Sequence, residues 1–529
     1  MKQFPWITAM LFLTIQSQAQ QKLPVITPYH SQNIRELYLD STNHHTALKT
    51  ILHEDTSAMY TQPDSSRRSW FHRKLFKEHL FEFREPDFNV FIDFLPDFQV
   101  GRSNQDKTLW LNTRGATVFG NIGDKFYFES SFYENQGVFP VYLDSFVTRR
   151  RVIPGQGQIK YNDVIGKAYD FSYVNALISY KPSKYLNFTL GYGNNSSYGD
   201  GYRSMILSDI GFSYPYIKIT ATLGQFQYTS MWAQFMDMSN QSFNQAYEDL
   251  GYNKKWGVFH FLDWNATKKL TIGVFDAVIW PDTDTAGHKR GFDWTYLNPV
   301  IFLRPAEYSA GSSDNAMIGM NIKYKLFPKL TAYGQLVLDE FKLKEFFGGE
   351  GWWGNKWSTQ LGFRSFDLFR VKKLDLQGEL NVSRPYTYSF RNGQGNYAHY
   401  NQPLAHPMGA NFVEALGIAS WSVKRWYLRG QFSYAQYGLD YNKYVSNGQD
   451  IFKSYVNRTG DYNIKMLQGL KTDFMYGQGT IAYVLNPKYN LRLEASVAGR
   501  QEKNSQYTHK ELMFSFGLRS TFRQLYYDY

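Results

Sequence analysis

Residues 374–383 read Leu-Asp-Leu-Gln-Gly-Glu-Leu-Asn-Val-Ser, in which apolar and polar side chains alternate with little interruption. Successive side chains of a β-strand point to opposite faces, so this segment predicts a strand with one apolar and one wet face. Residues 489–497 and 318–326 repeat the pattern. Because a water-soluble β-sandwich alternates in the same way as a membrane barrel, these segments alone predict only a β-rich chain.

The connections between the predicted strands distinguish the two folds. Short turns, most of them containing lysine, alternate with long connections rich in glycine, asparagine and tyrosine. The short turns are residues 123–125, 182–184, 214–216, 266–268, 328–329, 372–373, 424–425 and 486–488. The long connections include residues 135–169, 228–255, 281–315, 387–410 and 438–475. Tight periplasmic turns and long outer loops are typical of outer-membrane barrels, whereas a sandwich gives no reason for the alternation.

Eight short turns join sixteen strands in pairs, and one further strand at each end gives 18 if both chain ends face the periplasm. An even number is what such barrels require. The expected strands are residues 88–100, 108–120, 126–134, 170–180, 185–193, 204–213, 216–227, 256–265, 269–280, 316–326, 330–341, 357–371, 374–386, 411–423, 426–437, 476–486, 489–499 and 510–521. Pro96 interrupts the first of them, since proline cannot donate to a ladder. We therefore predict an all-β fold, an 18-stranded antiparallel transmembrane β-barrel.

The start of the chain differs from the rest. Lys2 precedes the apolar run from Trp6 to Ile15 and the sequence Ser17-Gln18-Ala19, which predicts a signal peptide over residues 1–19. Residues 20–85 are rich in His, Asp, Ser and Lys, and apolar residues recur at helical spacing between 66 and 83. This predicts a short, partly helical periplasmic or plug segment, followed by the barrel over residues 86–529.

The composition agrees with an exported barrel. The chain has no Cys, which excludes disulfides, thiolate catalysis and Cys-based metal sites. Aromatic residues make up 18% of the chain although its mean hydropathy is −0.47, as expected when each strand gives half its side chains to lipid and half to a wet lumen. The formal net charge of +11 suits polyanions such as lipopolysaccharide phosphates or acidic glycans, while nucleic acid is not an expected partner outside the cell.

No sequence signature of catalysis is present, since G-x-S-x-G, H-E-x-x-H and a Walker loop are all absent. Asp282 and Asp284 supply too few ligands for calcium, so we interpret them as part of an exposed acidic loop. His399 and His406 have no further ligands nearby in the sequence and are interpreted as ordinary surface histidines. We expect a protein that is not an enzyme and that holds no metal and no cofactor.

Aromatic residues gather in two of the long connections, together with arginine and asparagine. The first group is Trp352, Trp353 and Trp357, and the second is Tyr386, Tyr388, Tyr397 and Tyr400 around Arg391 and Asn392. Sugar rings stack on aromatic faces, and arginine donates paired hydrogen bonds to carboxylate or phosphate groups, so these loops are candidates for glycan binding. The alternative is the aromatic girdle that barrels carry at the two membrane interfaces.

The chain resembles the capsule-assembly Wzi family of outer-membrane proteins, and especially its gliding-motility RemB-type members. The resemblance covers roughly residues 85 to 521. It rests on Asn112-Thr-Arg-Gly115, Gly120-Asn-Ile-Gly123, Tyr198-Gly-Asp-Gly-Tyr-Arg-Ser204, Asn298-Pro299, Ser313-Asp-Asn-Ala-Met-Ile-Gly319 and Tyr333-Gly-Gln-Leu-Val-Leu-Asp-Glu-Phe341. It implies an 18-stranded barrel with a lectin-like role, and by analogy it adds as glycan-contacting candidates Asp200, Tyr202 and Arg203 in one outer loop and Asp314 and Asn315 in another.

The function expected from these observations is non-enzymatic binding or anchoring of surface polysaccharide, in capsule or exopolysaccharide assembly, with a link to gliding motility as a variant. The alternative is a passive or substrate-selective channel, in which lumen charges such as Lys323 and Glu379 line a path instead of pairing with one another. The expected location is the outer membrane. The expected partners are its lipid and lipopolysaccharide, surface polysaccharide, and the barrel-assembly machinery during biogenesis.

Overall fold

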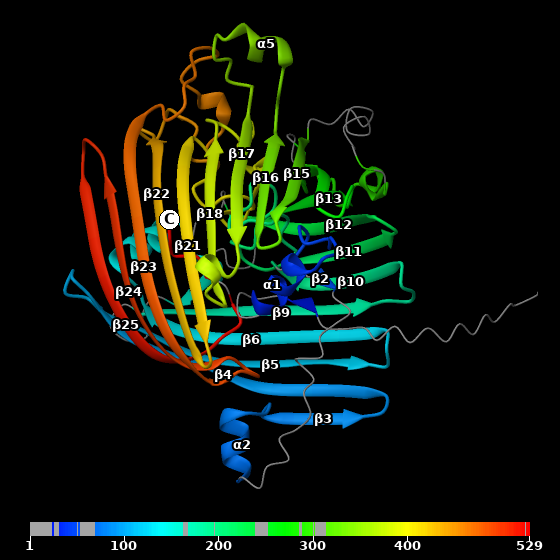
Figure 1. Ribbon diagram of the computed structural model, residues 1–529. Helices are drawn as coiled ribbons and strands as arrows, with labels where there is room; N and C mark the ends of the chain where they lie inside the picture. The colour runs from blue at the N-terminus through cyan, green and yellow to red at the C-terminus, as the bar shows by residue number, and fades with distance from the viewer. Residues whose placement is uncertain are drawn as a thin grey trace, which may run out of the picture.

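A computed structural model describes residues 24–25, 31–49, 51–52, 69–161, 168–194, 196–238, 252–284, 288–299, 301, 314–523 and 525–529. In this part of the chain 18 antiparallel strands close into one barrel, in which β25 pairs with β4 (Figure 1). The predicted fold class is therefore confirmed. No helix among the described residues is long and apolar enough to span a membrane.

The barrel strands follow one another around the wall in chain order. They are β4 (Phe88–Ser103), β5 (Thr108–Ile122), β6 (Phe126–Val138), β9 (Tyr169–Tyr180), β10 (Leu186–Gly193), β11 (Tyr214–Leu223), β12 (Phe226–Asp237), β13 (Asn253–Trp264), β14 (Leu270–Pro281), β15 (Asn315–Phe327), β16 (Leu330–Leu338), β17 (Trp357–Ser365), β18 (Leu374–Ser383), β21 (Phe412–Val423), β22 (Trp426–Leu439), β23 (Leu470–Asn486), β24 (Leu491–Lys503) and β25 (Thr508–Ser520). We call the end of the barrel with the tight turns the turn end, and the opposite end the loop end.

Two of the expected strands are wrong, although the total is right. Residues 204–213 form no strand, and the segment 216–227 is divided between β11 and β12, which meet at the turn Gly224–Gln225 instead of at 214–216. Residues 204–213 contain the apolar run Met205-Ile206-Leu207, and all three side chains are buried in a loop that folds into the lumen. Strand β12 was missed because it lay within the connection expected at 228–255.

The first barrel strand contains Pro96 without losing its place in the wall. On the side of β4 where the barrel closes, β25 pairs with residues 97–103. The short strand β3 (Phe81–Glu85) pairs with residues 88–92 on the same side. Pro96 lies between these two ladders, so only β5 pairs with it, through Arg114, and the ladder on the other side of β4 is interrupted at the residue that cannot donate a hydrogen bond. Close to this gap, Leu80 N–H donates to the side chain of Asp93 at 2.8 Å.

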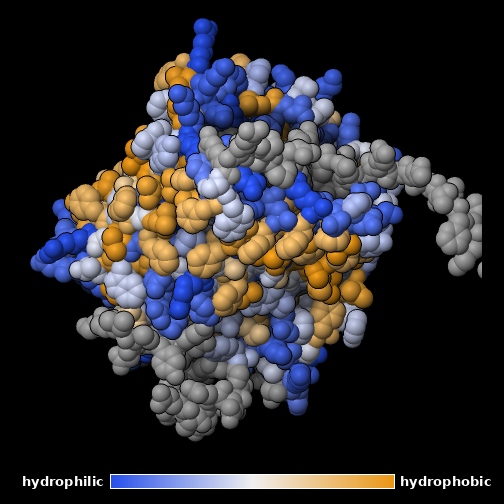
Figure 2. Space-filling view, turned by 90° about the horizontal axis from the view of Figure 1, so that it is seen from below, coloured by the Kyte–Doolittle hydropathy of each residue, from blue (hydrophilic) through white to orange (hydrophobic). Residues whose placement is uncertain are grey.

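The two faces of the wall differ as the alternation predicts. Apolar side chains that point outward remain widely exposed, for example Leu361 at 63%, Phe514 at 55% and Ile217 at 54%. Figure 2 shows hydrophobic residues gathered in a band between hydrophilic surfaces. An apolar surface of this extent is not stable in water, so the outward face fits the acyl chains of a membrane.

The lumen is occupied by chain segments that enter from both ends. Helix α1 (Ser31–Leu39) and the small sheet of β1 (Pro24–Val25) and β2 (Ile51–Leu52) lie inside the ring of strands, and the C-terminus ends there too (Figure 1). The other helical elements are α2 (Trp70–Phe76), α3 (Val141–Arg150), α5 (Leu343–Gly348), η3 (Trp294–Leu297), η4 (Leu368–Arg370), η5 (Gly393–Gly395) and η6 (Tyr455–Asn457). The short strands β7 (Val152–Ile153), β8 (Gly157–Tyr161), β19 (Ala398–His399) and β20 (Gln402–Pro403) complete the described elements. The expected signal peptide lies outside the described residues.

Replacing Phe514 by lysine tests the outward face. A lysine at mid-wall in lipid costs about 2–4 kcal/mol, so we expect Phe514→Lys to lower the free energy of unfolding by that amount in phospholipid vesicles. Phe347, which is 77% exposed on α5 at the loop end, is the matched control, and Phe347→Lys is expected to change little. Equal effects of the two substitutions, measured by urea titration of Trp fluorescence, would contradict the assignment of the lipid face.

Candidate functional site

Four segments fill the lumen and are bonded to one another and to the wall. We call residues 31–52, 194–213, 384–411 and 521–529, so far as they are described, the lumen plug. At its centre the Arg203 guanidinium, which is buried, donates to Glu414 of β21 at 3.1 Å and to Asp528 of the C-terminal tail at 3.0 Å. Burial alone would lower the pKa of Arg203, but the two carboxylates raise it well above its ordinary value. This ion cluster joins a loop, the wall and the tail.

Asp200 joins the same loop to the N-terminal segment. Its carboxylate accepts hydrogen bonds from Tyr38 at 2.6 Å and Thr46 at 2.5 Å, and Lys323 of β15 bonds to Thr46 at 2.8 Å. Burial would raise the pKa of Asp200, but Lys323, Lys49 and the two hydroxyl groups hold it below its ordinary value. Asp200 and Arg203, expected in an outer loop, therefore lie in the lumen, because their glycine-containing loop turns inward to reach these partners.

Three of the five tyrosines predicted to bind glycan, Tyr386, Tyr388 and Tyr397, are buried. Tyr388 and Tyr397 donate their hydroxyl protons to the carbonyl oxygens of Met205 and Ile206 at 2.6 and 2.8 Å, and Tyr386 donates to Ser446 at 2.9 Å. These bonds fix one plug segment to another and to the loop 440–469. A glycan at the surface cannot reach these rings while the plug is in place, so any ligand-binding role for them stays a prediction.

The remaining candidates outside the tryptophan group are also held by protein contacts. Asp314 accepts two bonds from Arg290, at 2.7 and 3.1 Å, while Asn315 donates to the carbonyl oxygen of Gly395 at 2.8 Å. Tyr400 packs edge-on against Phe212 with 5.0 Å between ring centroids. Tyr202 stacks near Tyr526 of the tail, at 5.1 Å. The structure does not bring these residues together with the tryptophans.

His399 and His406 are not surface histidines, contrary to the expectation from sequence. Both are buried, because the segment that carries them lies inside the barrel. His399 Nδ1 accepts from Met236 N–H at 3.0 Å, so its Nε2 carries the proton that it donates to the carbonyl oxygen of Ser213 at 3.1 Å. Burial lowers the pKa of His399 to about 3, and the neutral ring is the form that fits both bonds.

Trp352 and Trp353 of the predicted site are half-buried at the loop end, where they belong to a group of aromatic and cationic side chains. The indole of Trp353 contacts Tyr455, at 4.7 Å between ring centroids, and the guanidinium of Arg458, whose Cζ is 4.3 Å from the Trp353 centroid. Trp352 is 5.9 Å from Trp353, and Lys342 Nζ is 4.6 Å from the Trp352 centroid. We call these five residues the outer aromatic cluster.

Backbone bonds between two loops hold the outer aromatic cluster together. Trp353 N–H donates to the carbonyl oxygen of Asp461 at 2.9 Å, and Asn463 N–H donates to that of Glu350 at 2.8 Å. Arg391 is exposed beside the cluster, where its carbonyl oxygen accepts from Ser454 at 2.6 Å. Trp357 is the first residue of β17 and alternates with the inward-facing Ser358, so it belongs to the outward face and fits the aromatic girdle.

Tyr455, Arg458 and Lys342 are members of the cluster that the sequence did not reveal. Tyr455 and Arg458 lie about a hundred residues from Trp353 in the sequence, and Lys342 lies on the other side of helix α5. The pairing of the two loops brings them together. An Arg three residues after a Tyr in a long loop is a common pattern, so no signal in the sequence marked this one.

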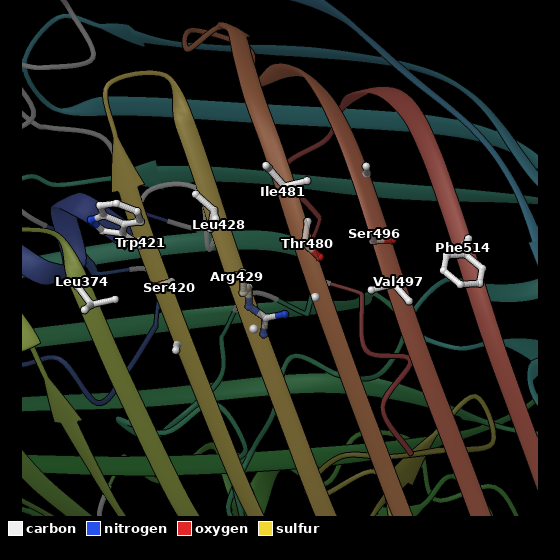
Figure 3. Close-up of a pocket in the computed structure, with 14 residues that line it drawn as sticks. Leu374, Ser420, Trp421, Leu428, Arg429, Thr480, Ile481, Ser496, Val497 and Phe514 are labelled. Atoms are coloured by element: carbon white, nitrogen blue, oxygen red, sulfur yellow. The ribbon is translucent and has the colours of Figure 1, made fainter.

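A hollow of about 660 Å³ lies elsewhere, across β18 and β21–β25 (Figure 3). Its floor includes Ala419, Gly430 and Gly479, which stand directly opposite one another on three strands, and Trp421, Leu428 and Ile481 line its edge. None of the predicted glycan-binding residues lines it. Among the described residues no group of three or more His, Asp or Glu side chains is arranged to hold a metal ion.

Comparison with known proteins supports the fold. No protein-family model matches the chain, and no curated protein matches it significantly. Among solved structures it is similar to Wzi of Escherichia coli, described as an outer-membrane protein involved in group 1 capsule assembly and a carbohydrate-binding β-barrel, with a TM-score of 0.53 and 13% identity over 95% of this chain and 100% of Wzi. The match to OprD of Pseudomonas aeruginosa, with a TM-score of 0.43 and 9% identity over 81% of this chain and 94% of OprD, is too loose to support an argument.

Removing the central cation of the plug is expected to destabilise the barrel. Arg203→Met removes the cation that Glu414 and Asp528 share, although His406 still bonds to Glu414 and Gln431 to Asp528, and breaking a buried ion pair typically costs about 3–5 kcal/mol. The control is Arg102→Met, since Arg102 and Asp106 form an exposed pair at the loop end and such pairs contribute little. Urea unfolding midpoints that are equally shifted in both variants would argue against the ion cluster as the centre of the plug.

The buried neutral His399 predicts a loss of stability in acid. In the unfolded chain its pKa is about 6.5, so its stabilising contribution is complete above that pH and is lost as the pH falls toward the folded value of about 3. Between about pH 6.5 and about pH 4.5 we expect it to account for roughly 2 kcal/mol. The isosteric, non-titrating His399→Gln variant should show a correspondingly smaller pH dependence of urea unfolding, and identical pH profiles would contradict the prediction.

Proposed function

We propose that this protein binds or anchors a surface polysaccharide through its loop end, without cleaving it. The observation that carries the proposal is the outer aromatic cluster, in which two indole rings stand beside two cations at the exposed end of the barrel. Aromatic faces stack on the apolar faces of sugar rings, and Arg and Lys bind the acidic groups that many exopolysaccharides carry. The net charge of +11 favours an anionic polymer.

The rigidity of the cluster supports a binding role. Trp353 is held by contacts with Tyr455 and Arg458, and by its own N–H bond to the next loop. Arg458 in turn donates to Asp461 at 2.8 Å. Side chains fixed before the ligand arrives lose little conformational freedom on binding, which favours affinity.

The pairing of charged side chains in the lumen gives less support to the alternative function, a channel. The charges that could line a path are instead bonded: Arg492 pairs with Glu494 at 2.7 Å, and Lys323 Nζ donates to the carbonyl oxygen of His44 at 2.6 Å. Glu379 accepts from Tyr333 at 2.9 Å and from the amide of Arg203 at 3.2 Å. Buried groups satisfied in this way oppose a continuous water path.

The proposed setting is the outer membrane, reached through the signal peptide over residues 1–19 and inserted by the barrel-assembly machinery. Membership of the Wzi family is part of the proposal, and it rests on the sequence motifs and on the likeness of the two barrels. Lipopolysaccharide is the proposed neighbour of the outward face. Neither the site nor the comparisons favour the gliding-motility variant.

A binding experiment with matched tryptophan variants tests the proposal. Replacing Trp353 by alanine removes the ring at the centre of the cluster, so we expect a loss of at least about tenfold in affinity for acidic exopolysaccharide, equivalent to about 1.4 kcal/mol. Trp294→Ala is the control, because Trp294 is 76% exposed in a different connection, between β14 and β15. Unchanged binding by Trp353→Ala in a glycan-array or surface-plasmon measurement would remove the cluster from the proposal, and no binding by the unaltered barrel would remove the function.

A further inference from the structure

The hollow across β18 and β21–β25 opens on the outward face of the wall. Ala419 of its floor occupies an outward position, since Glu414, of opposite parity on the same strand, contacts the lumen plug. Gly430 and Gly479 stand directly opposite it in the register and share its face. The volume of about 660 Å³ lies within the range of small-molecule sites, about 300–1,000 Å³. Large apolar side chains surround the floor, as Figure 3 shows: Leu374, Trp421, Leu428, Ile481, Val497 and Phe514.

Glycine is frequent on this part of the outward face. Besides Gly430 and Gly479, the outward positions of the same strands include Gly417, Gly477 and Gly499. Gly477 stands directly opposite Gly499. Glycine weakens a strand, and inside a strand it usually marks a bulge, a close approach of another backbone, or a place where a ligand lies against the sheet.

The first two explanations do not apply to these glycines. The ladders from β21 to β23 are regular, and the single register shift between β23 and β24 lies away from them, at residues 484–486. A methyl group added to Gly417 or Gly430 would meet no described atom within 4 Å beyond the chain neighbours, and one on Gly477 would reach only the ring of Phe432, at 3.9 Å. The space above these glycines is open, so a ligand is the remaining explanation.

The open strip extends from the hollow toward the loop end. A row of directly opposed residues that begins at Leu374, the first residue of β18, ends at Val100 near the loop end of β4, so rows rise in that direction. Because barrel strands are tilted by about 45°, a line that crosses strands in this direction while it moves toward the loop end runs close to the membrane normal. Small residues follow such a line and lead to a lysine: Ala419, Gly430, Gly477, Gly499 and Lys510.

Two exposed lysines stand at the outer end of the strip. Lys510 of β25 lies opposite Gln501, and Lys503 of β24 lies opposite Asp473, all on the outward face. The Asp473 carboxylate accepts hydrogen bonds from Gln436 at 2.7 Å and from the Tyr434 hydroxyl at 3.2 Å. An apolar groove that ends at two cations is complementary to an acyl chain that carries an anionic headgroup.

We propose that the hollow and the strip above it bind one acyl chain of lipopolysaccharide, with a phosphate of its lipid A at Lys503 and Lys510. An unfilled depression deprives the side chains around it of van der Waals contacts, and a flexible acyl chain restores them. Lipopolysaccharide is the source because the cations lie at the loop end, which the proposed setting places in the outer leaflet. This lipid site does not depend on polysaccharide binding at the outer aromatic cluster.

A second copy of the chain fits the hollow less well than a lipid does. Two copies related by a twofold axis along the membrane normal present the same face to each other at the same depth. Lys503 and Lys510 of one copy would then lie beside the same lysines of the other, and like charges repel. A phosphorylated lipid brings the opposite charge to this position.

Native mass spectrometry of the full-length barrel, titrated in detergent with diphosphoryl lipid A, tests the chain part of the site. The unaltered protein is expected to retain one lipid A. Ala419→Leu and Gly430→Leu each place a side chain on the floor, so each should lower the affinity by at least about tenfold. The matched control is Ala116→Leu, because Ala116 is an exposed outward residue of β5, opposite Phe94 and Phe132 and outside the hollow.

The headgroup part is tested with a charge variant. Lys503→Gln combined with Lys510→Gln should weaken binding of diphosphoryl lipid A by at least about tenfold and leave binding of the dephosphorylated lipid unchanged. Lys268→Gln combined with Lys269→Gln, which alters two exposed lysines at the turn end, should change neither.

Three results would overturn the proposal, each with variants that keep the heat-dependent gel shift of a folded barrel. The first is equal lipid A binding by the Ala419→Leu and Ala116→Leu barrels. The second is phosphatidylglycerol that competes as well as lipid A. The third is an unaltered barrel that is a dimer and that Ala419→Leu converts into a monomer without a change in lipid binding. None of these results bears on polysaccharide binding, which the Trp353→Ala comparison tests separately.

Discussion

In a membrane every backbone N–H and C=O must find its partner within the protein, and in this chain the constraint is met by closing the sheet. The closure occurs between β25 and β4, where seven residue pairs form the ladder from Met513–Ser103 to Arg519–Asp97. Each strand then has one face toward lipid and one toward the lumen, which is why polar and apolar residues alternate. Asp97 and Arg519 reinforce the closure with a buried pair at 2.8 Å.

Closing 18 strands leaves a wide lumen, and this chain fills it with its own segments. The plug depends on ionic contacts between elements that are distant in sequence, with Arg203 between Glu414 and Asp528 at the centre. Because the loop 384–411 is fixed to this plug through Tyr388 and Tyr397, it supports the loops above it at the exposed end. The wall thus contacts the membrane, the plug holds the loops rigid, and the loop end presents the outer aromatic cluster.

The sequence was sufficient for the strand number, because alternation and turn spacing are local signals that the barrel must obey. It was not sufficient for residues 204–213, where an apolar run is buried within the plug although its composition is that of a lipid-facing strand. It identified Trp352 and Trp353 but not Arg458, and it placed Asp200 and His399 at the surface, because inward folding of a loop leaves no periodic signature.

The central claim is that alternate residues of each strand face lipid and a filled lumen. Spin labels on single introduced cysteines test it, and because the chain has no native Cys each label marks one position. Nitroxides placed in turn at residues 512–518 of β25 should collide with oxygen dissolved in lipid at Leu512, Phe514, Phe516 and Leu518. At the intervening positions they should be shielded from both oxygen and a water-soluble nickel complex. Free access of the nickel complex to Met513, Ser515 and Gly517 would contradict the filled lumen, and oxygen accessibility without a period of two would contradict the barrel in lipid.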